Sequence, residues 1–250
     1  MKKTVIILSI LTLILGACKQ EVKLWPTMTM ITYRLDVRIS LLGTGTAIVN
    51  WGDRTPDDMV MISKKRSEDF YHTYVDTASH TITVTGDNVT YWGCFQNQLI
   101  SLDVSKNTAL ERLLCEDNQL TSLDVSNNTK LTELNCSGNQ LTSLDVSKNT
   151  KLTDLYCDHN RLTSLDVSNN QALALLTIHS NKFDVAALNA VFGTLHSQVV
   201  WWDGDIIDGE RTKKMDIGNN PGTETCNRNI AADKGWRVSA LNPYLDWSKF

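Results

Sequence analysis

A 21-residue unit recurs in strict register through the middle of this 250-residue chain. The heptapeptide L-T-S-L-D-V-S begins at Leu120, Leu141 and Leu162, and a near copy begins at Leu99. A chain with a period of about 20–30 residues builds a solenoid, in which each unit buries its apolar face only against its neighbours. This period constrains the fold more than any other feature of the sequence.

The three most regular units cover residues 110–130, 131–151 and 152–172 and share the pattern L-x-x-L-x-C-x-x-N-x-L-x-S-L-D-V-S-x-N-x-x. An earlier unit at 89–109 has Val89 and Trp92 in leucine positions, and a fifth unit begins at Leu173 with Ile178 in place of cysteine. The pattern resembles the leucine-rich repeat family over residues 89–183. The resemblance implies a mainly β solenoid of four to five short coils, a scaffold that usually binds other molecules.

Each unit contains two halves that both follow L-x-x-L-x-(C/V)-x-x-N, so we expect strand-like backbone on both sides of a coil. The period of two in L-x-C and L-x-V directs these side chains inward. Two asparagine columns lie where the coil must turn, and their amides can satisfy unpaired backbone groups. The columns are Asn97, Asn118, Asn139, Asn160 and Asn181, and Asn107, Asn128, Asn149 and Asn170.

Four cysteines recur at the same spacing and are expected to stack in one interior column: Cys94, Cys115, Cys136 and Cys157. The spacing lacks the close ligand pairs that are typical of zinc sites. The sequence therefore favours a column of buried, unreactive thiols. Disulfides between stacked neighbours and a bound metal are the alternatives, and Cys226 lies outside the column.

The outward positions differ between the two halves of the unit. Beside the valines they repeat as Ser, Asp and Ser, whereas beside the cysteines they vary from unit to unit. By resemblance, the variable side is where leucine-rich repeat proteins present their ligand-binding strands. A merely solvated face is the alternative. The candidate recognition residues are Arg112, Glu133, Asn135, Asp154, Tyr156, Asp158 and His179.

The repeating carboxylates raise a separate question, because charges about 5 Å apart on neighbouring coils repel by about 1 kcal/mol per pair even in water. Serine hydroxyls and turn amides offset this repulsion, or Ca²⁺ does. Calcium prefers about six to eight oxygen ligands, so one carboxylate per coil makes a weak site, and no cofactor or metal is predicted. The weak Ca²⁺ candidates are Asp103, Asp124, Asp145 and Asp166. The acidic loop at 203–210 lacks EF-hand spacing, and beside it Trp201 or Trp202 could offer a flat surface to a sugar ring.

The N-terminus predicts export. Lys2 and Lys3 precede an apolar run at 4–15, which is too short to span a bilayer and is typical of a secretory signal. The sequence L-G-A-C at 15–18 resembles a bacterial lipobox, which implies removal of residues 1–17 and lipid attachment to Cys18. An uncleaved anchor and a simple signal with a chance cysteine are the alternatives. By analogy with lipoprotein sorting, Lys19 after the cysteine favours the outer membrane, with surface display open.

The formal net charge of −4 becomes two charges more negative once Lys2 and Lys3 are removed. The chain therefore lacks the basic footprint of a nucleic-acid-binding protein. After a tether at 18–27, no second apolar segment reaches the length of a membrane helix. We expect contact with the membrane only through the lipid anchor.

Residues 28–88 consist of short β-rich runs separated by turn residues. The segments A-I-V-N-W-G-D at 47–53, H-T-Y at 72–74 and H-T-I-T-V-T-G at 80–86 resemble a polycystic kidney disease (PKD) type β-sandwich. Arg54 stands where that family usually has glycine. The resemblance implies that Trp51 and Asp53 are fold determinants and that this domain is a spacer or interaction module.

The repeat is lost after Phe183, and residues 184–250 are expected to form an α/β cap that closes the solenoid. A helix is predicted at 184–193, with Asp184 as its N-cap and Gly193 ending it in a left-handed conformation. Its expected inward stripe is Val185, Leu188, Phe192 and Leu195. Short β runs at 199–202 and 214–217 and a short helix before Gly235 complete the predicted cap.

The leading functional prediction is a lipid-anchored envelope protein, not an enzyme, that binds a protein or a glycan through its variable face. An architectural spacer or assembly protein of the cell surface is the first alternative. A hydrolytic enzyme is the second, using His159 or His179 with Asp158, or His196 near Asp205. No nucleophile elbow or H-E-x-x-H motif supports the enzyme.

Overall fold

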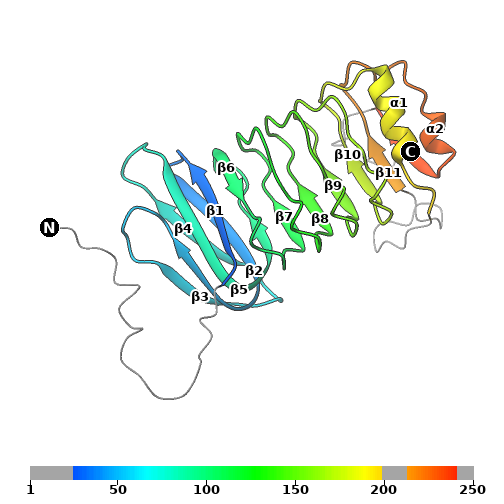
Figure 1. Cartoon of the computed structure of the whole chain (residues 1–250). Helices are drawn as coiled ribbons and strands as arrows, with labels where there is room; N and C mark the ends of the chain where they lie inside the picture. The colour runs from blue at the N-terminus through cyan, green and yellow to red at the C-terminus, as the bar shows by residue number, and fades with distance from the viewer. Residues whose placement is uncertain (1–24, 199–212, 241–250) are drawn as a thin grey trace.

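The computed structural model describes residues 25–198 and 213–240, which form an elongated, mainly β molecule (Figure 1). An antiparallel β-domain, a solenoid and a helix-bearing end follow one another along its long axis. The predicted signal with Cys18 lies outside the described residues, as do the acidic loop, Trp201 and Trp202.

The N-terminal β-domain is built around two long strands, β2 (Asp36–Asn50) and β5 (His80–Gly93). The first half of β2 pairs with β4 (Glu68–Thr73) and its second half with β3 (Asp58–Ile62), while β5 runs antiparallel along both halves. β1 (Thr27–Thr32) lies between β5 and β6 (Leu99–Asp103). Alternate apolar side chains of these strands are buried, as the period of a strand requires. The assignment of this domain to the PKD type stays a prediction.

The W-G-D and H-T-Y segments lie together in this domain. Trp51 is buried, its ring stacks on His72 with centroids 4.8 Å apart, and its carbonyl accepts a hydrogen bond from the Tyr74 hydroxyl at 2.7 Å. Asp53 accepts from the backbone of Thr55 and lies 2.7 Å from His72 Nε2. These contacts confirm that Trp51 and Asp53 stabilise the fold.

The solenoid is a ladder of short parallel strands on the cysteine side of each coil. The end of β5 pairs with β7 (Arg112–Leu114), followed in order by β8 (Glu133–Asn135), β9 (Asp154–Tyr156) and β10 (Leu175–Thr177). Each strand is matched to its neighbour at the 21-residue period, for example Leu113 to Leu134 and Leu134 to Leu155. The leucine, cysteine and valine columns are buried, which confirms the mainly β solenoid.

The expectation of strands on both sides of the coil is wrong. On the valine side only β6 is a strand among the described residues, and it pairs with β1 rather than with the next coil. In each unit the aspartate Oδ1 accepts a hydrogen bond from the serine N–H two residues later, as Asp124 does from Ser126 at 2.9 Å. The same turn follows β6, so it does not by itself prevent a strand. β6 differs because β1 lies beside it, whereas no strand among the described residues pairs with the valine side of the next coils.

The structure adds one turn that the sequence analysis missed. β11 (Lys213–Asp216) pairs in parallel with β10, and β12 (Trp236–Ser239) pairs with β11. Met215 stands opposite Leu176, Ile217 and Asn220 are buried, and the Asn220 amide donates to the carbonyls of Ile178 and Ile217. The spacing Met-x-Ile-x-x-Asn is thus a degenerate form of L-x-C-x-x-N, and the solenoid has about six turns.

Two helices complete the C-terminal end, α1 (Val185–Thr194) and α2 (Asn229–Ala232), close to the positions predicted. Asp184 caps α1 by accepting from the Ala187 N–H at 2.8 Å, as predicted. Two details were wrong. Gly193 lies inside the helix and does not adopt a positive φ, and Val185 is exposed while Val191 is buried in its place. No helix among the described residues is long and apolar enough to cross a membrane.

The four cysteines of the column are fully buried and unpaired, so the thiol column is confirmed and the disulfide alternative is wrong. Burial raises the pKa of each thiol well above its ordinary value. Cys226 is half-buried and also unpaired. The two asparagine columns are buried as well, and their side chains bond the backbone of neighbouring coils.

Candidate functional site

The candidate recognition residues form two columns on the strands and a third column just beyond them. Arg112, Glu133 and Asp154 stand side by side on β7, β8 and β9, and Asn135 stands beside Tyr156 in the next column. Asp158 and His179 follow in the third column, where the chain leaves β9 and β10. The seven predicted residues therefore lie on one face of the molecule, which we call the variable face.

Charge pairing links the first column. Arg112 Nε lies 2.5 Å from Glu133 Oε2, and the guanidinium lies over the ring of Tyr91, 5.3 Å from its centroid. The side chain of Arg112 is 46% exposed and that of Glu133 is 24% exposed, so this pair is open to a ligand. An exposed pair of this kind contributes at most about 1 kcal/mol to stability.

Two carboxylates on the face are partly buried without full pairing. Asp154 Oδ2 accepts from the Thr153 hydroxyl at 2.6 Å, but Oδ1 has no partner among the described residues, and neither does Glu116 Oε2. Burial raises the pKa of Asp154 and of Glu116. Unpaired buried oxygens are costly, so these two side chains would gain from a donor supplied by a ligand.

Asn135 and Tyr156 are less available than the sequence suggested. Asn135 Oδ1 already accepts from the backbone N–H and the hydroxyl of Ser137, at 3.1 and 2.7 Å. Tyr156 is half-buried, and burial raises its pKa to about 12. Its phenol therefore stays neutral at physiological pH.

A compact cluster closes the C-terminal end of the variable face. Asp158 Oδ2 lies 3.0 Å from His159 Nδ1 and 3.2 Å from His179 Nε2, and the imidazole rings meet edge to face with centroids 4.7 Å apart. Burial alone would raise the pKa of Asp158, but hydrogen bonds from His179, Thr177 and His159 outweigh it and lower the pKa to about 2. His179 is only 2% exposed, so it is a buried member of the face.

Two residues beside this cluster were not among the predicted site residues. The Thr177 hydroxyl donates to Asp158 Oδ1 at 2.5 Å and orients that carboxylate. Asp216, opposite Thr177 on β11, is fully buried, and its Oδ2 has no hydrogen-bond partner among the described residues. The only sequence signal for Asp216 was the degenerate Met215-x-Ile217 spacing around it.

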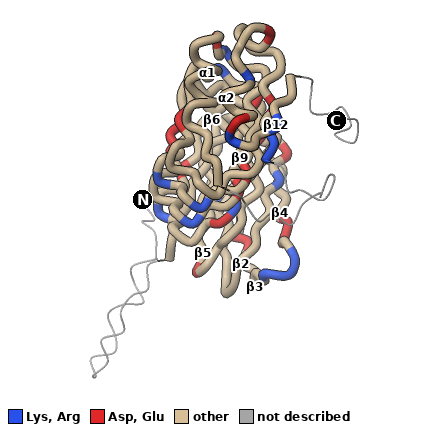
Figure 2. Tube along the Cα trace, turned by 90° about the vertical axis from the view of Figure 1, so that its right-hand side faces the viewer, with Lys and Arg blue, Asp and Glu red and all other residues tan. Residues whose placement is uncertain are grey.

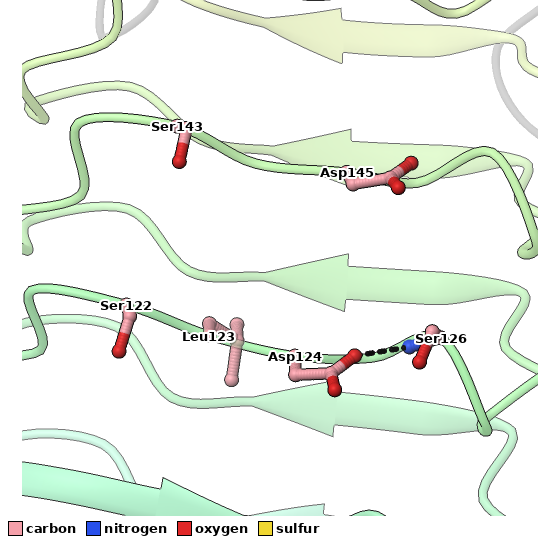
Figure 3. Close-up of a pocket in the computed structure, with 6 residues that line it drawn as sticks. All are labelled: Ser122, Leu123, Asp124, Ser126, Ser143 and Asp145. Carbon is pink, nitrogen blue, oxygen red and sulfur yellow. Dashed lines mark hydrogen bonds between the residues drawn. The ribbon is translucent and has the colours of Figure 1, made fainter.

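The valine side presents a regular acidic face. A shallow, open pocket of about 270 Å³ lies between two neighbouring coils there, lined by Ser122, Leu123, Asp124, Ser126, Ser143 and Asp145 (Figure 3). The carboxylates of Asp103, Asp124 and Asp145 accept hydrogen bonds from serines two residues later, which lowers their pKa. Turn amides and hydroxyls thus offset the repulsion between coils, and Ca²⁺ at Asp103, Asp124, Asp145 and Asp166 stays a weak prediction.

Basic and acidic residues are interspersed along the chain in the view of Figure 2, without a basic half.

One of the predicted catalytic candidates, His196, has a structural role. His196 is buried, its Nε2 lies 2.7 Å from the carbonyl oxygen of Leu173, and its ring packs against Trp236. Its proposed partner Asp205 lies outside the described residues.

Neither a protein-family model nor a curated protein matches this chain. Among solved structures, the functional domain of InlJ from Listeria monocytogenes, described as including a cysteine ladder, is 35% identical, with a TM-score of 0.44, over 56% of this chain and 27% of that one. The internalin inlF from Listeria monocytogenes str. 4b F2365 is 21% identical, also with a TM-score of 0.44, over 56% of this chain and 37% of that one.

The chain thus spans well under two thirds of the length of either solved structure. Its own repeat, its parallel ladder and its buried leucine, cysteine and asparagine columns define a leucine-rich repeat-like solenoid.

Proposed function

We propose that this protein is a lipid-anchored envelope protein that binds a protein or a glycan through its variable face, and that it is not an enzyme. One observation carries the proposal: the two sides of the same coils differ. Positions beside the valines repeat one turn motif, whereas positions beside the cysteines carry a different side chain in each coil. The first set closes the same local turn in each coil, and no shared structural role explains the diversity of the second.

The chemistry of the face favours a ligand with basic or hydrogen-bond-donating groups. Arg112 is already paired with Glu133, which leaves Glu116 and Asp154 as acidic groups that each have one oxygen without a partner among the described residues. Donors from a ligand could satisfy the free oxygens of Asp154 and Glu116. Charge attraction of this kind speeds association and weakens with added salt.

The test compares two faces of the same coils. Full-length protein is applied to extracts of cell-surface proteins and to a glycan array. The variable-face variant carries Asp154→Ala, Tyr156→Ala and Asp158→Ala, and the matched control carries Ser143→Ala, Asp145→Asn and Ser164→Ala on the valine side. We expect at least a tenfold loss of binding for the first variant, a loss that shrinks in high salt, and wild-type binding for the control.

Equal binding by both variants would contradict the placement of the ligand site. The architectural alternative predicts a different pattern in cells, where replacement of the variable columns costs nothing but removal of a whole repeat does. Circular dichroism of both variants confirms that each is folded before binding is compared.

A further inference from the structure

Three ligand-type atoms converge at the C-terminal end of the variable face. Asp158 Oδ2, His159 Nδ1 and His179 Nε2 all lie within 4.8 Å of one another. In a tetrahedral zinc site with bonds of about 2.0–2.1 Å, neighbouring ligand atoms stand about 3.3 Å apart. The two measured separations, 3.0 Å to His159 and 3.2 Å to His179, are close to that edge length.

The surroundings hold these side chains in position. Thr177 donates to the second oxygen of Asp158, which leaves Oδ2 facing the imidazoles. On His179, Nδ1 lies 3.3 Å from the Ser180 hydroxyl, which leaves Nε2 facing the carboxylate. Protein metal sites use outer partners of this kind to fix the tautomer and orientation of each ligand.

A second, independent observation concerns Asp216. It is fully buried, it lies across the strand pair from Thr177, and its Oδ2 has no partner among the described residues. Thr177, opposite it, donates to Asp158, so Asp216 lies on the coil next to the cluster. A dication would offset the charges of two carboxylates that are otherwise costly to bury together.

Access to the cluster is one-sided. His179 is buried, whereas the side chain of His159 is 54% exposed. His159 also has a φ of 50°, a left-handed conformation that the equivalent Gly138 shares with a φ of 63°. Histidine, asparagine and aspartate are the residues other than glycine that tolerate this conformation best. The exposed imidazole of His159 is therefore the side of the cluster that faces solvent.

We propose that Asp158, His159 and His179 bind one divalent transition-metal ion of the zinc type, with an open position toward solvent. Two imidazoles and one carboxylate suit Zn²⁺ or Co²⁺, whereas Ca²⁺ and Mg²⁺ prefer oxygen ligands. The site shares Asp158 and His179 with the variable face, but its test contains the protein and the metal alone, so its outcome does not depend on a protein or glycan ligand.

The experiment titrates ZnCl₂ into metal-free full-length protein by calorimetry, and Co²⁺ is added separately to record the visible absorption of a tetrahedral site. We expect one bound ion per chain and an increase in Tm. The key variant is His159→Asn, which tolerates the left-handed backbone and removes an exposed side chain, so it should fold. We expect at least a tenfold loss of Zn²⁺ affinity in it and a similar loss in Asp158→Asn.

Two controls keep the result specific. His80→Asn removes an imidazole that also lies 3.0 Å from a carboxylate, that of Asp76, but no third ligand lies there in the described part of the chain. Cys226→Ala removes the half-buried thiol. Both should bind Zn²⁺ as the wild type does. The proposal would be overturned if His159→Asn bound Zn²⁺ as tightly as the wild type, or if the wild type showed no saturable binding. Either result would mean that Asp158, His159 and His179 form hydrogen-bonded Asp–His pairs and no metal site.

Discussion

The two asparagine columns satisfy different numbers of backbone groups. Asn139 donates to the carbonyls of Cys115 and Cys136 and accepts from the N–H of Leu120. Asn149 donates to two carbonyls, but its Oδ1 has no partner among the described residues. The first column therefore ties each coil to its neighbour through both ends of the amide, and the second through one end.

We predict that Asn139→Ala lowers the free energy of unfolding by about 2–4 kcal/mol, because it leaves the buried N–H of Leu120 without a partner and removes the bonds that the amide donates to the carbonyls of Cys115 and Cys136. Asn149→Ala should cost less, about 1–2 kcal/mol, since only donors are lost. Urea unfolding of both variants measures the difference. Equal midpoints would show that the acceptor of Asn139 contributes nothing.

The stability of the folded protein should depend on pH through His196. Burial lowers its pKa below the ordinary value of 6.5, and Lys213 and Lys234 act in the same direction. Below pH 6.5 the unfolded chain therefore binds a proton at this residue that the folded chain does not, so stability falls as the pH falls through the folded pKa.

We expect the Tm of the wild type to fall more steeply between pH 7 and about pH 5 than the Tm of His196→Gln, measured by calorimetry. The remaining histidines are present in both proteins, so the difference in slope belongs to His196. Parallel curves would mean that protonated His196 is accommodated in the folded state.

At the scale of elements, the thiol column predicts a pattern of reactivity. Cys94, Cys115, Cys136 and Cys157 are buried with raised pKa values, whereas Cys226 is half-buried. Because the thiolate is the nucleophile, native protein treated with iodoacetamide should be labelled at Cys226 and not in the column, as peptide mass spectrometry can show. In urea all five should react. Labelling of Cys136 in native protein would show that the coils open.

The valine-side turns give a matched pair of substitutions. Asp124→Asn keeps an oxygen to accept from Ser126, whereas Asp124→Ala removes it. We expect no change in unfolding free energy for the first and a loss of about 0.5–1 kcal/mol for the second. A calcium chelator should leave the Tm of the wild type unchanged. A chelator effect that Asp124→Asn abolishes would indicate bound Ca²⁺ instead.

The sequence predicted those elements whose residues repeat. The inward columns follow from a period of two within a period of 21, and α1 followed from its cap at Asp184. The missing strands on the valine side were not predictable from hydrophobicity, because L-x-V has the period of a strand in every coil, whereas only β6 has a neighbouring strand, β1, to pair with. The sixth turn was hidden because an inserted segment separates Met215 and Ile217 from the unit that they continue.

The candidate site was predictable only as a set of positions. Comparison of units located the variable face, but register alone does not show that Asn135 bonds Ser137 or that His179 is buried. Asp216 could not be found, because Thr177, which stands opposite it, belongs to a coil from which an inserted segment separates it in sequence. Pairing between distant segments decides such contacts.

At the scale of the whole molecule, stability should depend on the period itself. Deletion of residues 131–151 removes one complete unit and joins Lys130 to Leu152 in register, so we expect a folded protein of lower stability. Deletion of residues 131–150 removes one residue fewer and leaves Lys151 as an extra residue in the turn, where Leu131 N–H normally bonds the Asn128 carbonyl. We expect that second variant to unfold at a lower urea concentration than the first, as circular dichroism can show. Similar unfolding curves for the two would mean that the coils do not depend on register.

The strand β5 belongs to two parts of the molecule at once. Its beginning pairs with β1 and β2 in the N-terminal domain, and its last three residues pair with β7 in the solenoid (Figure 1). No flexible joint separates the two parts, so a torque applied to one is passed through the backbone to the other. The molecule acts mechanically as a lever, and whatever holds its N-terminal domain also sets the direction in which the variable face points.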